Sequence, residues 1–277
     1  MKSNNFQAQL DNNQTIKRSI SRGLHLAGQA IYVIWMREMK RFFRAKSRLI
    51  SNLAMPFFFL FAMNFGFGGK NMPGTFQGVD YLDFLTPGII GMTLLFNSMF
   101  TGLSTLWDKE FGFLKEIMVA PIKRPVIILG RIAGGVTTNL IQGILILIIS
   151  LLMGFKMAFL LSLAPAILFM VLISVGFSGL SVVIASIMED PQGFPLVMHF
   201  FTFPCFLFSG ALFPIANFPN WIRPLSLINP LTYGVDGLRA SLINCSRFPL
   251  LWNLSILLIF GLVMIILGSY LFSKTEV

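Results

Sequence analysis

The chain has 277 residues, of which 55% are hydrophobic, only 12% are charged and 30 are phenylalanine. This composition excludes an ordinary soluble enzyme or soluble binding module. The formal net charge is +10, but the basic residues cluster beside apolar segments, so we attribute the excess to membrane topology and expect no nucleic-acid partner. The sequence predicts an all-α integral membrane protein.

The N-terminal part is predicted to lie outside the membrane core. Residues 1–23 are polar and lack the apolar run of a signal peptide, so we expect a flexible cytoplasmic tail. Residues 24–48 are typical of a basic amphipathic helix in the membrane interface, with Trp35 at the headgroup level. Its apolar face would consist of Ile31, Ile34, Trp35, Met39 and Phe42.

Residues 49–277 are predicted to form one transmembrane domain. Six apolar segments each approach or exceed the ~20 residues that a helix needs to cross a bilayer. They are residues 49–66, 84–107, 132–155, 157–187, 194–213 and 250–272. Sixteen of the 21 Lys and Arg residues fall on the side that holds both termini and the 108–131 loop, and five fall on the other. This asymmetry predicts that both termini are cytoplasmic.

The segment from Asp108 to Arg131 is the longest charged run between two apolar spans. Its apolar residues recur at helical spacing, so we expect a short helix that Pro121 and Pro125 terminate. Such a helix offers a surface for a water-soluble partner, although an ordinary interfacial loop helix would show the same pattern.

The loop from Pro214 to Pro249 is too apolar to be fully solvated and contains too many prolines to form a span. We therefore expect short re-entrant helices in the outer leaflet, covered by protein or lining a cavity. Asp236 and Arg239 are three residues apart on one of these helices and are predicted to neutralise each other.

The sequence lacks the residues of a nucleotide site or a metal site. Gly69-Lys70 lacks both the preceding Gly and the following Ser or Thr of a phosphate-binding loop, so the chain itself should not bind ATP. His25 and His199 lie on different elements, and Cys205 and Cys245 receive no role. His199, inside the fifth span, is either functional or a neutral side chain hydrogen-bonded to a neighbouring helix.

A polar stripe follows one face of the second span. It consists of Thr93, Asn97, Thr101 and Ser104, at intervals of four, four and three. Such residues most often mediate helix packing in lipid, and the alternative is that they line a translocation path.

Two motifs resemble those of the permease subunits of type-2 ATP-binding-cassette exporters, in particular the daunorubicin-resistance-like multidrug branch. The first matches the family pattern E-x-G-x-L-x-E followed by Pro and Gly-Lys/Arg. Its residues are Glu110, Gly112, Leu114, Glu116, Pro121, Arg124, Gly130 and Arg131. Phe113 departs from the Thr that many members have after the glycine, which puts the substrate branch in doubt.

The second motif is similar to the family's NPLTYxxDxxR and the residues that precede it. It includes Phe213, Pro214, Trp221, Asn229, Pro230, Tyr233, Asp236 and Arg239. The resemblance implies an interfacial N-terminal helix, six spans, a cytoplasmic coupling helix between spans two and three, and re-entrant helices between spans five and six. It places the first motif at the coupling surface and the second at an outer gate.

The resemblance further implies a half-transporter in the cytoplasmic membrane of a prokaryote, with a second permease chain and a separate ATPase subunit that holds ATP and Mg. The expected function is export of an amphipathic or hydrophobic compound. Export of a polysaccharide or lipid-linked glycan is an alternative of the same class. A passive channel or a membrane assembly protein is an alternative of another class, which a neighbouring gene for an ATPase would disfavour.

Overall fold

The structure, a computed structural model, describes residues 26–66, 79–111 and 124–274. These residues form helices, turns and loops without a β-strand, as the sequence predicted. Five of the helices in this part of the chain are long and apolar enough to cross a membrane. They are α2 (Lys46–Gly66), α3 (Tyr81–Glu110), α5 (Arg124–Leu152), α6 (Leu163–Ile187) and α10 (Leu250–Lys274).

The fifth predicted span is shorter than expected. Residues 194–213 contain α7 (Phe194–Phe208), an apolar helix of 15 residues, followed by a turn. At 1.5 Å per residue α7 is about 22 Å long, which is less than the ~30 Å of a hydrocarbon core. Gly210, with φ of +77°, and Pro214, which follows the turn, explain why the helix stops before residue 213.

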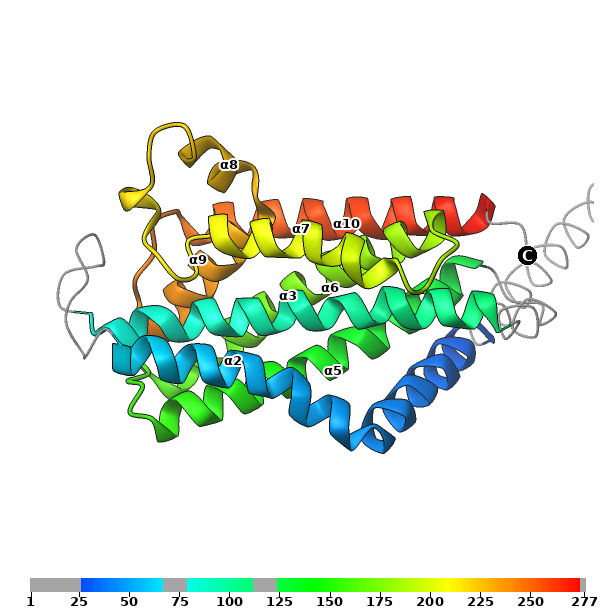
Figure 1. Cartoon of the computed structure of the whole chain (residues 1–277), viewed down its shortest axis with the longest axis horizontal. Helices are drawn as coiled ribbons and strands as arrows, with labels where there is room; N and C mark the ends of the chain where they lie inside the picture. The colour runs from blue at the N-terminus through cyan, green and yellow to red at the C-terminus, as the bar shows by residue number, and fades with distance from the viewer. Residues whose placement is uncertain (1–25, 67–78, 112–123, 275–277) are drawn as a thin grey trace, which may run out of the picture.

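The long helices run side by side along the longest axis of the molecule (Figure 1). One end holds the 26–44 helix, the last turns of α3 and the C-terminal turn of α10; we call it the basic end. The other end holds α8 (Arg223–Ile228) and α9 (Pro230–Ile243), and we call it the α9 end.

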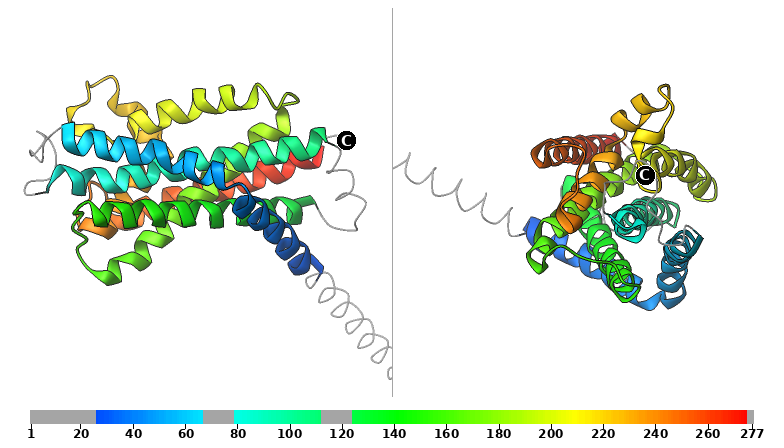
Figure 2. Two further views of the ribbon diagram at one scale, coloured as in Figure 1. Left: turned by 60° about the horizontal axis from the view of Figure 1, so that its bottom comes forward. Right: turned by 90° about the vertical axis from the view of Figure 1, so that its left-hand side faces the viewer.

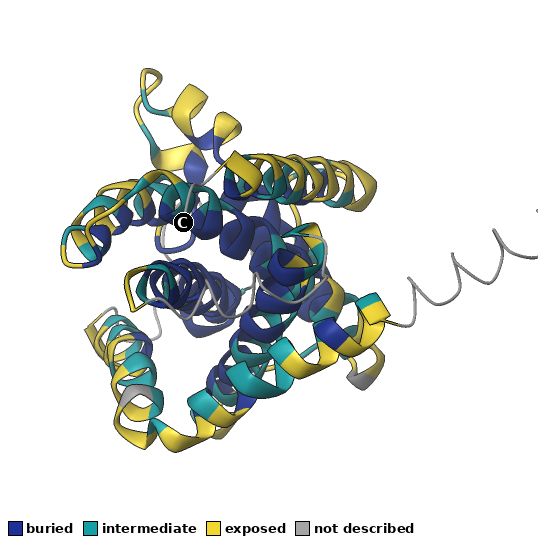
Figure 3. Ribbon diagram, turned by 90° about the vertical axis from the view of Figure 1, so that its right-hand side faces the viewer, coloured by how far each residue is buried: buried dark blue, intermediate teal, exposed yellow. Residues whose placement is uncertain are grey.

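The bundle is organised around α3. In the most apolar part of α3, 83% of residues are buried, compared with 17% in α10 and 11% in α2. α3 packs mainly against α6 and α5, and α10 covers the other side of α6. Viewed along the bundle, the buried residues gather between these helices and the exposed ones lie outside (Figure 3).

Two glycines of α3 allow neighbouring backbone to come very close. A Cβ atom at Gly102 would overlap the Ser181 carbonyl oxygen of α6, and one at Gly88 would overlap the Ala211 carbonyl oxygen in the turn after α7. Only glycine fits such approaches without displacing backbone. α3 is therefore fixed to its neighbours near both ends.

The helices α2 and α7 flank α3 and pack on it less extensively than α5 and α6 do. Each carries a proline in its interior, Pro56 in α2 and Pro204 in α7. A proline inside a helix removes one backbone hydrogen bond and favours a local bend.

Several predicted boundaries were wrong. α3 extends to Glu110 instead of residue 107, and α5 begins at Arg124 instead of residue 132. The prediction ended both spans at their charged residues, but helices continue through charges that are paired within the protein. The predicted spans 132–155 and 157–187 are also too long, because α5 ends at Leu152 before a turn at Gly154, and the 3₁₀ helix η1 (Leu160–Ser162) precedes α6.

A helix spans residues 26–44, within the segment for which an interfacial helix was predicted, and Ala45 alone separates it from α2. It runs at an angle to the bundle (Figure 2). Met39 and Phe42 of its apolar face are buried, and the Trp35 Nε1 donates to Thr137 Oγ1 of α5 at 2.9 Å. The helix therefore binds the bundle through specific contacts with α5.

Candidate functional site

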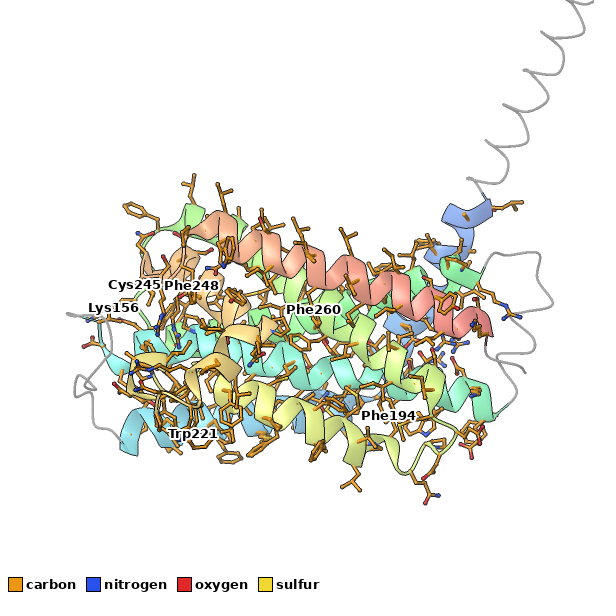
Figure 4. The ribbon with its side chains drawn as sticks, turned by 90° about the horizontal axis from the view of Figure 1, so that it is seen from above. Lys156, Phe194, Trp221, Cys245, Phe248 and Phe260 are labelled. Carbon is orange, nitrogen blue, oxygen red and sulfur yellow. The ribbon has the colours of Figure 1, made fainter. Side chains whose placement is uncertain are left out.

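A cleft of about 200 Å³ opens beside α3, between α2 and α7. Its walls are mostly apolar and include methionine from α2, methionine and phenylalanine from α3, and phenylalanine from α7. Phe194, at the start of α7, is labelled in Figure 4. A few polar side chains line it as well, among them Asn52, Thr93, Asn97 and His199. Mostly apolar walls with a few polar groups are typical of binding sites for small amphipathic molecules.

The predicted polar stripe of α3 is buried and contacts its neighbours. Asn97 donates to Gln142 Oε1 of α5, and Thr101 lies 3.4 Å from Ser178 Oγ of α6. Thr93 and Ser104 donate to carbonyl oxygens of α3 itself, at 2.8 and 3.1 Å. These contacts agree with helix packing, while Thr93 and Asn97 also reach the cleft wall.

His199 does not make the hydrogen bond to a neighbouring helix that we considered. Its ring is exposed at the cleft, 6.0 Å from the Phe96 ring, and it has no hydrogen-bond partner among the described residues. The ring therefore remains available to a molecule in the cleft.

At the basic end, one buried carboxylate joins three elements. Asp108 of α3 accepts from Arg131 of α5 at 2.8 Å and from Arg37 of the 26–44 helix. The side chains of Asp108 and Arg131 are 8% and 2% exposed. Arg41 lies 3.9 Å from the second carboxylate oxygen. Because the pair is almost fully desolvated, each charge depends on the other for compensation.

The structure separates the residues of the first motif. Glu110 is exposed at the end of α3 and has no ion-pair partner within the described chain. Arg124 donates to the Ser273 carbonyl oxygen of α10, Gly130 packs on Ile34, and Arg131 is buried. The predicted coupling helix lies outside the described residues, as do four of the motif's members. These are Gly112, Leu114, Glu116 and Pro121.

The second motif forms the expected short helices at the α9 end. Asn229 has an extended backbone between α8 and α9, and its side chain caps α9 by accepting from the Leu231 N–H at 3.0 Å. Pro230 occupies the first turn of α9, where its missing N–H costs nothing. The Tyr233 hydroxyl donates to the Leu227 carbonyl oxygen at 2.7 Å and holds α8 against α9.

The remaining residues of this motif divide between surface and interior. Trp221, labelled in Figure 4, is 73% exposed, and Phe213 is 37% exposed. Pro214 is buried in the turn that leads to η2 (Ile215–Asn217). The aromatic side chains Trp221 and Phe213 are thus available to lipid or to another protein.

The predicted ion pair between Asp236 and Arg239 is wrong, because both side chains bind other groups. Asp236 accepts from the Arg247 and Phe248 backbone N–H groups at 2.8 and 3.0 Å and from Asn253 Nδ2 at 2.9 Å.

Arg239 donates to three carbonyl oxygens, those of Phe84, Gly210 and Ala211, at 2.8 to 3.2 Å. Burial lowers the pKa of Arg239 to about 10, and the nearby Asp236 charge opposes that shift, so the guanidinium stays protonated at neutral pH. Its Cζ lies 3.7 Å from the centre of the Phe84 ring.

Sequence reasoning did not anticipate the Asp108 cluster. The sequence places Asp108 and Arg131 in a cytoplasmic loop, because they lie directly outside the predicted spans 84–107 and 132–155. The available signal was their position: opposite charges at the end of one apolar run and the start of the next can meet when both helices extend through them.

A family model described as "ABC-2 type transporter" matches residues 29–243 of this chain. Two curated relatives align over most of their length. "Putative transport permease ycf38" of Cyanophora paradoxa is 28% identical over 89% of this chain and 88% of its own. "Inner membrane transport permease YadH" of Escherichia coli K12 is 28% identical over 86% of this chain and 92% of its own.

A third relative, "Probable multidrug ABC transporter permease YbhR" of Escherichia coli K12, is 26% identical over 63% of this chain and 48% of its own. The family model covers more than half of the chain, and the five apolar helices agree with a protein of this kind. The chain belongs to the ABC-2 type transporter family, as a membrane subunit of an ATP-binding-cassette transporter.

Proposed function

We propose that the chain exports an amphipathic or hydrophobic compound from the cytoplasm, together with a second permease chain and a separate ATPase subunit that binds ATP and Mg. The observation that carries this proposal is the cleft between α2, α3 and α7. The relative YbhR, whose name describes it as a probable multidrug transporter permease, supports the same class of cargo.

The chemistry of the cleft favours a compound with a large apolar part. Met55, Met99 and Phe100 offer adaptable apolar contacts, while Asn97 and His199 offer hydrogen bonds. A glycan would instead require a continuous wall of polar and aromatic groups to replace the water around its hydroxyls. The cleft therefore supports drug-like or lipid-like cargo over a polysaccharide.

The proposed orientation has six crossings with both termini in the cytoplasm. α7 provides the fifth crossing, and its shortfall in length is compensated by the buried turn of residues 209–212, which continues toward the α9 end. The basic end then faces the cytoplasm, in agreement with the accumulation of Lys and Arg there.

Energy is proposed to enter at the segment between α3 and α5. Glu110 is exposed at the start of this segment, without an ion-pair partner in the described chain, so it can meet a basic group of the ATPase. The pair between Asp108 and Arg131 ties α3 to α5 directly beside it, and Arg37 adds the 26–44 helix. A displacement of the segment would therefore move three helices together.

The test uses proteoliposomes that contain the chain, its ATPase and a fluorescent amphipathic dye. Met55→Trp places a bulky ring in the cleft and should lower ATP-dependent dye export at least tenfold without changing insertion. Phe57→Trp, two residues away on α2 and not in the cleft, is the matched control. Equal export by both variants would remove the cleft from the transport path.

A further inference from the structure

A groove of about 600 Å³ lies at the basic end, between the 26–44 helix and the last residues of α3. Its volume falls within the ~300–1,000 Å³ that ligand pockets typically have. The described residues that line it are Arg37, Lys40, Arg41, Arg44, Ala45, Asp108 and Phe111. Four cations and one carboxylate give these side chains a formal charge of +3.

The protein leaves much of this positive charge uncompensated. The Asp108 Oδ2 already accepts from Arg37 and Arg131. Arg41 approaches Asp108 only to 3.9 Å, and its buried Nη1 has no hydrogen-bond partner. Lys40 and Arg44 have no carboxylate within 4.0 Å in the part of the chain that the structure describes. Donors remain for an anion to bind.

The spacing of the four cations brings them together. Arg37, Lys40, Arg41 and Arg44 recur at intervals of three, one and three, so they share one face of the 26–44 helix. Basic side chains at a membrane surface usually spread into the headgroup region, but these four line one groove with the end of α3. Mutual repulsion among them is a cost that a bound anion would offset.

The surroundings of the groove are those of a membrane interface. Arg41 lies 5.9 Å from the Trp107 ring, and Trp is enriched at the headgroup level of membrane proteins. Phe111, in the groove, and Phe43, beside it on the 26–44 helix, are 76% and 58% exposed. Cations next to exposed aromatic rings match a ligand that has a phosphate joined to an apolar part.

We propose that this groove binds the phosphate of an anionic phospholipid, with Lys40, Arg41 and Arg44 as the principal donors. The acyl chains would lie against the exposed Phe43 and Phe111. A bound lipid would add a contact between the 26–44 helix and α3, beside the pair that Arg37 already makes with Asp108. Lipid binding to this groove requires neither cargo nor ATPase, so it can be tested without transport.

The experiment measures lipid binding to the full chain, purified in detergent, by native mass spectrometry. Phosphatidylglycerol and phosphatidylcholine with the same acyl chains are compared, and we expect only the anionic lipid to be retained. Each basic residue near a lipid phosphate contributes about fivefold to affinity, so Lys40→Ala with Arg44→Ala should weaken retention of phosphatidylglycerol roughly 25-fold. Lys40→Arg with Arg44→Lys keeps both charges and should restore most of it.

A matched control removes the same charge at the same end. Lys46→Ala with Lys274→Ala changes two cations that do not line the groove, and retention should fall less than about threefold. An equal loss in both double variants would overturn the site in favour of general surface charge. Inorganic phosphate is the second arm: full displacement of the lipid by millimolar phosphate would overturn the lipid assignment, and persistence of the lipid supports it.

Discussion

The two ends of the bundle bury an aspartate and an arginine in opposite ways. At the basic end, Asp108 binds Arg131 directly, across two helices. At the α9 end, Asp236 and Arg239 lie on one helix, yet each binds backbone or amide groups of other segments. The first arrangement is an ion pair, and the second is two separate sets of hydrogen bonds.

This difference determines what each pair can do. The ion pair at the basic end is a single contact between two helices, so α3 and α5 must keep their relative position for it to persist. At the α9 end, Asp236 organises the chain at Arg247 and Phe248 before α10, while Arg239 holds the turn after α7. The α9 end is therefore a junction of many backbone hydrogen bonds, whereas at the basic end α3 and α5 are joined by a single buried ion pair.

The largest effect is expected from Asp108→Ala. This change leaves Arg131 buried without its carboxylate, which should cost about 3–5 kcal/mol of stability. The measurement is thermal unfolding of the purified chain in detergent. Combining Asp108→Leu with Arg131→Met should recover most of the loss, and a double variant as unstable as Asp108→Ala would contradict the ion-pair interpretation.

Asp236→Ala should be the next most damaging, at about 2–4 kcal/mol, because three hydrogen-bond donors lose their acceptor in the interior. The loss of stability in the double variant with Arg239→Ala should be close to the sum of the losses in the two single variants, since the two side chains share no hydrogen-bond partner. If the double variant lost less stability than that sum by more than about 1 kcal/mol, the direct ion pair that the sequence predicted would be supported.

A smaller effect is expected where α3 approaches α6. Gly102→Ala forces a methyl group against the Ser181 carbonyl oxygen and should cost about 1–3 kcal/mol through overpacking. Gly28→Ala is the control, because no atom lies within 4 Å of its Cβ position and alanine favours a helix. Similar melting temperatures for both variants would show that α3 and α6 can move apart to accommodate the methyl group without loss of stability.

The smallest effect concerns an exposed pair at the α9 end. Lys156 Nζ donates to Asp80 Oδ2 at 3.1 Å, and this hydrogen bond raises the pKa of Lys156. Because the pKa of Lys156 is raised, the pair stabilises the folded protein at pH values below the usual pKa of lysine. This stabilisation is lost as the pH rises above that value. This contribution is fully present near neutral pH, but solvent screens the exposed pair, so Asp80→Asn should leave the melting temperature there unchanged within measurement error. A change as large as that of Asp108→Ala would undo the contrast between buried and exposed pairs.

Sequence patterns predicted the helical class and the short helices between Pro214 and Arg239 because both depend on local signals. Apolar length and proline spacing can be seen in the chain itself. Contacts between distant elements could not be predicted in the same way. Neither the partners of Arg239, which come from α3 and the turn after α7, nor the approach of Arg37 to Asp108 has any signature in one segment.

Span boundaries failed for a related reason. Charged residues limit apolar helices only when their charges reach water. Asp108 and Arg131 are compensated within the protein, so their helices extend past them. The residues that line the cleft were predicted only in part. Thr93 and Asn97 form a polar stripe in the sequence, but no sequence pattern indicated that α2 also lines the cleft.

The interior prolines of α2 and α7 give the cleft a mechanical property. Pro56 itself lies in the cleft wall, and Pro204 lies in the helix of the facing wall, whereas α3 between them is fixed by Gly88 and Gly102. The proline of α3, Pro87, is buried near the start of its helix, where Gly88 holds the backbone against Ala211. Bending is therefore expected in α2 and α7, the two outer walls, so the width of the cleft can change without a bend in α3.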